Sequence, residues 1–297
     1  MSWLFFALLP RALWAINNVV DKTLVSSRIR NSTVYLFITI VVSALVVVVV
    51  PFRGLAVPSL GMVSLALFTG IIYTYGLWPY YKALMLEEAS RAVSLWNVVP
   101  IFVLIISSMT IGENFGASDY WAFILLMLGS FMISTRHHEG KFKVSAGVWL
   151  MLLSSVIYAI ELVLAKYVYL NMPYLDGFIW IRIGSVLALL PFLFRPNFRR
   201  VIREIFTSLS GKVRAIIAGN EVLALGAIAS FEYAISKSSV SLVSALGGTQ
   251  SLFLLAFVAI MTHWKPTLLK EELARGAWLI KLVAILVIVI GVYLSAV

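Results

Sequence analysis

Long apolar segments alternate with short polar ones along almost the whole chain. Ten apolar runs, separated by proline, glycine or charge, are long enough to cross a bilayer, since a spanning helix needs about 20 mostly apolar residues. The expected helices cover residues 3–24, 32–52, 59–82, 90–111, 119–136, 146–170, 177–195, 213–236, 240–262 and 274–296. Barrel strands would alternate over stretches of about 10 residues, whereas LVVVVVPF and LVAILVIVIGVYL are continuous apolar runs. The pattern therefore predicts an all-α membrane protein with ten transmembrane helices.

The connections between these helices are short, and the longest cover residues 196–212 and 263–273. The first contains the segment NFRRVIREIF, in which apolar residues recur at helical spacing with basic residues between them. Its apolar positions are Phe198, Val201, Ile202, Ile205 and Phe206. A basic amphipathic segment is typical of a helix that lies in the membrane interface, so we expect such a helix here.

The composition indicates that lipid is the solvent for most of the surface. Apolar residues make up 62% of the 297 positions and charged residues 12%, against roughly 45–50% and about 25% in soluble domains. Ten spans use most of the chain and leave no room for a sizeable soluble domain. Cysteine is absent, which excludes disulfides and thiolate metal sites.

The net charge of +10 reflects membrane topology rather than nucleic-acid binding, because the basic residues fall in short segments between apolar runs. Of the 23 basic residues, seventeen lie in one set of alternating connections and three in the other set. Those three are Arg53, Lys166 and Lys237, and a further three, Arg11, Arg182 and Lys281, lie inside spans. The bias places the basic connections in the cytoplasm and both termini outside, in a multi-pass protein of the plasma or inner membrane.

The chain carries an internal repeat. WAINNVVDK at 14–22 aligns with YAIELVLAK at 158–166, and KALMLEEASRAVSLW from Lys82 aligns with YAISKSSVSLVSALG from Tyr233. LLMLGSFMIS from Leu125 aligns with LVIVIGVYLS from Leu286. Because five spans is an odd number, the second copy enters the bilayer in the opposite orientation. We therefore expect two inverted five-helix repeats, residues 1–137 and 144–297.

Three short motifs in the first half connect the chain with a known superfamily. They are an aromatic-small-x-Asn…Lys pattern (Trp14, Ala15, Asn17, Lys22), an Ala-Leu…Ala-Ser…Pro stretch (Ala83, Leu84, Ala89, Ser90, Pro100) and a Gly-Glu pair (Gly112, Glu113). In these motifs the chain resembles the drug/metabolite transporter superfamily, specifically its EamA-type branch with five plus five helices. The resemblance covers nearly the whole chain and implies a ten-helix membrane transporter.

Two departures from the family pattern lie in the second copy. Ser251 stands where a helix-breaking proline would be, and His263-Trp264 replace the Gly-Glu pair. We therefore do not expect the kink of the fourth helix to be mirrored in the ninth. Members of the family often have cytoplasmic termini, whereas the charge distribution here predicts external ones.

Ionisable residues at membrane depth are costly and normally face a cavity or a partner. They are Arg11, Glu161, Arg182, Glu221, Glu232 and Lys281. Glu161 shares a helix face with Tyr158 and is matched to Asn17 in the repeat, so we expect it to line the substrate pathway. The alternative is a packing role, in which Glu161 pairs with Arg182.

The remaining acidic and basic groups lie at different depths. Glu221 lies about a third of the way into its helix, where a carboxylate suits proton exchange, or alternatively a hydrogen bond to a neighbouring helix. Glu232 and Lys281 lie nearer the helix ends, from which long side chains can reach the interface.

Aromatic and amide side chains add further candidates. Trp78 and Trp96 could line a cavity and hold a cation on the ring face, whereas Tyr80 and Tyr81 fit an interfacial aromatic belt. Asn97, and the GGTQ segment at 247–250, interrupt apolar helices, as residues that line a pathway do. The predicted substrate-binding set is Asn17, Trp78, Trp96, Asn97, Tyr158, Glu161, Arg182, Glu221 and Gln250.

The sequence contains no catalytic constellation, no helical histidine pair and no Walker motif, so we predict no enzyme activity, metal or cofactor. We predict a secondary transporter or exporter that works by alternating access on a small metabolite, with an amino acid or similar zwitterion as the candidate substrate. Protons are the candidate coupling ion, with Glu161 or Glu221 as the exchanging group. The alternatives are a lipid or lipid-linked-sugar flippase and a non-transporting membrane scaffold subunit. The sequence does not indicate an oligomeric state.

Overall fold

The computed structural model describes residues 2–29, 31–86, 95–113, 115–134, 145–250, 252–254, 256–257 and 277–296. Regular structure in this part of the chain is helical throughout, which confirms the all-α prediction. Among the described residues, six segments are long and apolar enough to cross a membrane: α1 (Ser2–Leu24), α2 to α3 (Ser32–Arg53), α4 (Leu60–Leu86), α8 (Ala146–Asn171), α9 to α10 (Tyr174–Leu193) and α12 (Gly211–Lys237). Shorter apolar stretches lie in α6 (Val99–Thr110), α7 (Ala117–Ser134), α13 (Val240–Ala245) and α15 (Ala277–Ala296).

Two of the expected helices are broken by proline. The run at 32–53 divides into α2 (Ser32–Ser43), a 3-10 helix, η2 (Ala44–Val49), and α3 (Val50–Arg53). Pro51 lacks the N–H that would continue the α-helical ladder. The run at 177–195 likewise divides into α9 (Tyr174–Leu187) and α10 (Leu190–Leu193), which contains Pro191.

The ninth apolar run is also distorted, contrary to the expectation from the missing proline. After α13 the chain forms a 3-10 helix, η3 (Leu246–Thr249), which includes two consecutive glycines. In the first half the chain makes a turn at Asn97 and Val98 just before α6. Both halves therefore interrupt the helix at corresponding places, one beside a proline and the other at a glycine pair. Ala89, Ser90, Ser251, His263, Trp264 and the side chain of Lys281 lie outside the described residues.

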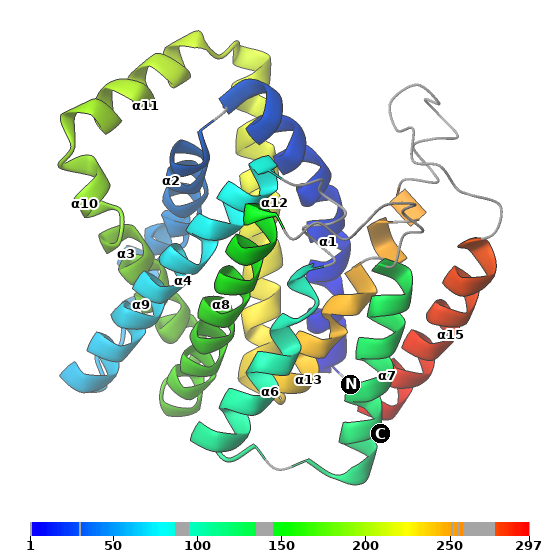
Figure 1. Cartoon of the computed structure of the whole chain (residues 1–297). Helices are drawn as coiled ribbons and strands as arrows, with labels where there is room; N and C mark the ends of the chain where they lie inside the picture. Colours follow the sequence, from blue (N-terminus) through cyan, green and yellow to red (C-terminus); the bar gives the residue numbers. More distant parts are fainter. Residues whose placement is uncertain are drawn as a thin grey trace.

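Helices of the first half pack mainly on helices of the second. α4 contacts α8 and α9, α1 contacts α12, α6 contacts α8 and α13, and α7 contacts α15. Figure 1 shows α7 and α15 side by side at one edge of the molecule and α9 and α10 toward the opposite edge. Both termini lie at the same end, and α11 lies at the other end.

Two of these contacts depend on glycine. A Cβ at Gly70 of α4 would overlap the carbonyl oxygen of Ile181, and a Cβ at Gly184 of α9 would overlap that of Leu67. The two backbones therefore touch at this crossing, as small residues permit in membrane proteins. Two further glycines mark the crossing of α7 and α15. Gly129 lies against Ala284 and Ile288, and Gly291 lies against Ala122 and Leu126.

The connection at 196–212 forms helix α11 (Pro196–Ser208), which confirms the predicted amphipathic helix. Its apolar residues are half-buried and pack on the hydrophobic core, with Phe198 against Phe37 and Phe192. Arg199, Arg200 and Arg203 are exposed on its other face.

Candidate functional site

A cavity of about 130 Å³ lies between α1, α4, α6, α8, α12 and the segment around η3. Both halves of the chain contribute to it. Its aromatic lining consists of Trp14, Tyr73, Tyr80, Tyr81, Trp96, Tyr158 and Phe231. Its polar and charged lining consists of Arg11, Asn17, Asn18, Asp21, Thr39, Asn97, Ser244 and Gln250. The cavity therefore combines ring faces with amides and a few charges, as small-molecule sites do.

Arg11 supplies a cation to the cavity. Its Nη2 donates to the carbonyl oxygen of Val243 at 2.9 Å, and its guanidinium lies 4.5 Å from the ring centre of Phe231 and 5.3 Å from that of Trp14. Its Nε has no hydrogen-bond partner among the described residues. A buried guanidinium held by a carbonyl and two rings keeps donors free for an anion.

A network of neutral donors surrounds two carboxylates beside the cavity. Asp21 accepts hydrogen bonds from the Tyr35 hydroxyl at 2.5 Å and from Nδ2 of Asn220 at 2.6 Å. Glu221 accepts one from the Thr39 hydroxyl at 3.1 Å. Asp21 and Thr39 line the cavity, and Glu221 lies behind them, buried.

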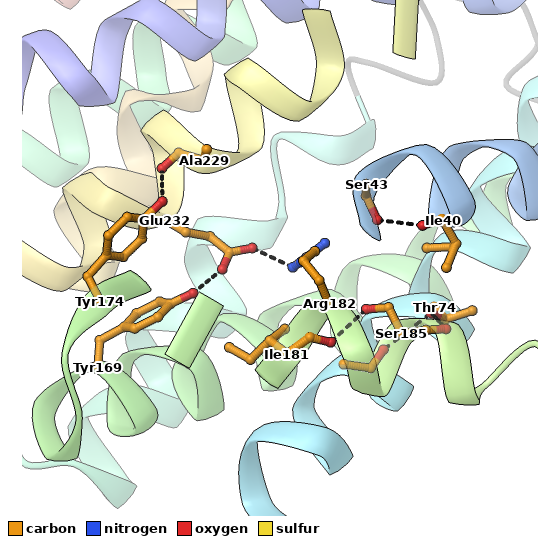
Figure 2. A network of polar contacts seen from close by, with 11 residues as sticks. Ile40, Ser43, Thr74, Tyr169, Tyr174, Ile181, Arg182, Ser185, Ala229 and Glu232 are labelled. Atoms are coloured by element: carbon orange, nitrogen blue, oxygen red, sulfur yellow. Dashed lines mark hydrogen bonds and ion pairs between the residues drawn. The ribbon is translucent and has the colours of Figure 1, made fainter. Parts of the chain in front are cut away.

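A second buried cluster contains an ion pair. Figure 2 shows Arg182, whose Nη2 lies 2.6 Å from Oε1 of Glu232, and Tyr169, whose hydroxyl donates to the other oxygen of that carboxylate. The guanidinium lies 4.2 Å from the ring centre of Tyr73, which lines the cavity. Glu232 is only 1% exposed. The expectation that it reaches the membrane interface is therefore wrong, because Arg182 and Tyr169 hold it inside.

Five predicted site residues line the cavity: Asn17, Trp96, Asn97, Tyr158 and Gln250. The lining does not include the other four, Trp78, Glu161, Arg182 and Glu221. Trp78 donates through Nε1 to Thr33, and its ring contacts Phe192 and the Lys82 ammonium. Glu161 is buried, and the described residues make no hydrogen bond to either of its carboxylate oxygens. In the alternative interpretation Glu161 pairs with Arg182, but the ion pair that Arg182 forms among the described residues is with Glu232.

The prediction from sequence misses four lining residues of α1 itself. Arg11, Trp14, Asn18 and Asp21 are spaced by three or four positions, so they share one face of the helix. The sequence does contain a signal for these lining residues. Polar and aromatic residues form a stripe along one face of α1, and this stripe begins with an intramembrane arginine.

Two lysines make the same kind of contact in the two halves. Lys22 Nζ donates to the carbonyl oxygen of Leu84 at 2.7 Å, near the end of α4. Lys166 Nζ donates to that of Ile235 at 2.9 Å and to that of Ser238 at 2.8 Å, at the end of α12. Each lysine thus satisfies carbonyl groups that a helix end leaves free.

Glu113, from the Gly-Glu motif, joins the halves at the start of α13. Its carboxylate accepts from the backbone N–H of Val240 at 2.7 Å and from the Ser241 hydroxyl at 2.8 Å. A carboxylate in this position satisfies the free N–H groups of a helix start.

These features belong to a multi-pass membrane protein with a cavity between the two halves of its chain. Residues 1–135 match the EamA-like transporter family, and this part of the chain is a domain of that family. The members of this family are transporters and not enzymes. Membership of a transporter family implies a small-molecule substrate. A solved crystal structure matches 99% of this chain and 96% of its own, with a TM-score of 0.69 and 15% identity, so the two proteins share a fold. None of the curated proteins compared with the chain matches it.

Proposed function

We propose that the protein is a secondary active transporter or exporter that moves a small metabolite through the cavity by alternating access. The observation that carries the proposal is Arg11, a buried cation in the wall of a cavity that both halves build, whose Nε has no hydrogen-bond partner among the described residues. The proposed substrate class is an amino acid or a similar zwitterion. Its carboxylate would bind Arg11, and its ammonium would lie against the ring faces of Trp96 and Tyr158.

The geometry of α1 favours this arrangement over one in which a single substrate molecule binds both Arg11 and Asp21. Ten residues separate the two positions, which is about 15 Å along a helix at about 1.5 Å per residue. The carboxylate and ammonium of one amino acid are too close together to contact both. Asp21 and its network therefore belong to the opposite end of the cavity from Arg11, and one substrate molecule does not contact both at once.

The size of the cavity argues against the flippase alternative. Its volume of about 130 Å³ is below the roughly 300–1,000 Å³ of pockets for drug-sized ligands. A lipid-linked sugar needs more space and several cations for its phosphates, whereas Arg11 is the only basic residue in the described lining.

Ten spans in two inverted five-helix repeats are part of the proposal. Lys22 and Lys166 are matched in the internal repeat, and so are the carbonyl groups they contact, at Leu84 and Ile235. The α7–α15 crossing is reciprocal in the same way. In each helix a glycine lies against an alanine and a branched residue of the other helix. Such reciprocity supports a two-fold axis in the membrane plane between residues 1–137 and 144–297.

The proposed orientation has both termini outside and α11 in the cytoplasmic interface. The supporting observations are the charge asymmetry of the connections and the position of α11 at the end opposite both termini (Figure 1). A tag at the C-terminus should therefore react with impermeant reagents in intact cells, whereas a tag in the α11 connection should not.

The substrate proposal is tested by uptake of labelled amino acids into proteoliposomes. Replacing Arg11 by Gln removes the charged donor, and a hydrogen bond to a charged group contributes about 1.5–3 kcal/mol, so we expect substrate affinity to fall by about 10- to 100-fold. Arg200→Gln on exposed α11 is the matched control and should leave affinity unchanged. Equal affinity in Arg11→Gln, or equal transport of amino acid amides that lack the carboxylate, would contradict the proposal.

A further inference from the structure

Three ionisable side chains meet in the interior, outside the described lining of the cavity. Arg182 comes from α9, Glu232 from α12 and Glu161 from α8, and each is at most 1% exposed. Arg182 and Glu232 form the ion pair of Figure 2. Glu161 interacts electrostatically with both of them. The cluster thus holds two carboxyl groups and one cation.

In this cluster some acceptors of Glu161 and some donors of Arg182 have no hydrogen-bond partner among the described residues. Both carboxyl oxygens of Glu161 lack a partner among the described residues, and so do Nε and Nη1 of Arg182. In the part of the chain that the structure describes, the surrounding titratable groups offer no second cation in direct contact. They are Tyr73 of α4, Tyr158 and Tyr169 of α8, Tyr174 of α9 and, from α1, Arg11, which acts on Tyr158. One guanidinium can balance only one carboxylate.

We propose that Arg182, Glu161 and Glu232 form a proton-binding site, which holds one exchangeable proton on the glutamate that is not paired with Arg182. In the conformation described here that glutamate is Glu161. A neutral carboxyl group needs no counter-ion, so burying Glu161, to which the described residues make no hydrogen bond, costs much less than burying a carboxylate there. When the proton leaves, the two free nitrogens of Arg182 are the donors available to the new carboxylate.

The proton-binding site lies next to the cavity, so a solute in the cavity can affect it. Tyr73 contacts the Arg182 guanidinium and also lines the cavity, and Tyr158 lines the cavity one turn from Glu161 on α8. Glu232 follows Phe231, another lining residue, on α12. A solute that moves these aromatic rings changes the surroundings of all three charged groups. The use of the proton in transport rests on the proposed function, whereas the presence of the proton does not.

The test is infrared difference spectroscopy of the purified full-length protein, which records the C=O stretch of protonated carboxyl groups during a pH titration in sodium-free buffer. Charge balance gives the expected number of protons in each variant. Glu161→Gln and Glu232→Gln each leave one carboxylate for one cation, so each should lose one carboxyl signal relative to the wild type. Arg182→Gln leaves two carboxyl groups without a cation and should gain one. Glu204→Gln on exposed α11 is the control and should change nothing.

Glu161→Gln is the decisive variant because Glu161 has no hydrogen bond to lose among the described residues, so the fold should persist at an unchanged melting temperature. An unchanged carboxyl band in this variant overturns the proposal, and so does a wild-type band that does not vary with pH. A band that is lost on adding sodium assigns the site to a metal cation and also overturns it. If the band behaves as expected but proteoliposomes transport no amino acid, the proton site stands and the proposed substrate is wrong.

Discussion

Two glutamates on one face of α12 show that side chains of the same type can be buried with different partners. Glu221 and Glu232 are eleven residues apart, which is three helical turns, or about 16 Å. Between them, Ala224 and Ile228 line the cavity. Glu221 is 3% exposed and Glu232 is 1% exposed. The cavity is therefore flanked along α12 by a buried carboxyl group at each end.

The partners of these two groups differ. Glu221 and its neighbour Asp21 receive hydroxyl and amide hydrogen bonds from Thr39, Tyr35 and Asn220, and no ion pair joins either to a cation in the described part of the chain. Glu232 has a guanidinium instead. Neutral donors are individually weaker than charged ones. The Asp21–Glu221 end can therefore rearrange at lower cost than the Arg182–Glu232 end.

The largest effect should follow from removing the cation. Arg182→Met leaves Glu232 without its counter-ion, and breaking a buried pair by removing one partner costs about 3–5 kcal/mol. Unfolding in SDS titrations should therefore shift by this amount in free energy. Arg200→Met breaks an exposed pair on α11 and should change stability by less than about 1 kcal/mol. Equal losses in the two variants would mean that burial of the Arg182 pair has no energetic consequence.

An intermediate effect is expected from Tyr35→Phe, which deletes the hydroxyl that donates to Asp21. Leaving a buried acceptor without its donor should lower the free energy of unfolding by about 1–3 kcal/mol. Tyr167→Phe, at an exposed tyrosine of α8, is the control and should be neutral. A Tyr35→Phe loss as large as that of Arg182→Met would contradict the proposed difference between the two ends.

The smallest effect should come from Thr39→Val, which keeps the shape of the side chain and removes the hydroxyl that donates to Glu221. The expected loss is about 0.5–1.5 kcal/mol, measured in the same SDS titrations. Thr207→Val on α11, whose hydroxyl bonds only within its own helix, is the matched control. A stabilised Thr39→Val variant would show that Glu221 does not depend on this donor.

The sequence predicts much of the fold because spanning helices are set by local composition. The ends of α1, α4, α8 and α12 fall within a few residues of the apolar runs. The division of residues 32–53 is not predicted, although Pro51 lies directly after the 3-10 segment. A run of valines is apolar in either helix type, so hydropathy does not distinguish one continuous helix from two.

The candidate site is less predictable because it depends on how helices rotate against one another. Asn97 and Gln250 interrupt apolar helices, and this local signal predicts them. Trp96 is predicted as an aromatic cavity residue, and Asn17 and Tyr158 are predicted through the repeat and the helix face of Glu161; all five line the cavity. The partner of Arg182 is different. Glu161 and Glu232 are both acidic residues at membrane depth on other helices, and only the packing of α8, α9 and α12 decides which of them it contacts.

The backbone contact between Gly70 and Gly184 bears on the order in which the chain can assemble. Residues 1–135 form one family domain in sequence, yet α4 packs chiefly on α8 and α9, which follow that domain. The close contact at Gly70 can form only once α9 has been synthesised and inserted. The third helix of the family domain therefore takes most of its packing contacts from the second half of the protein.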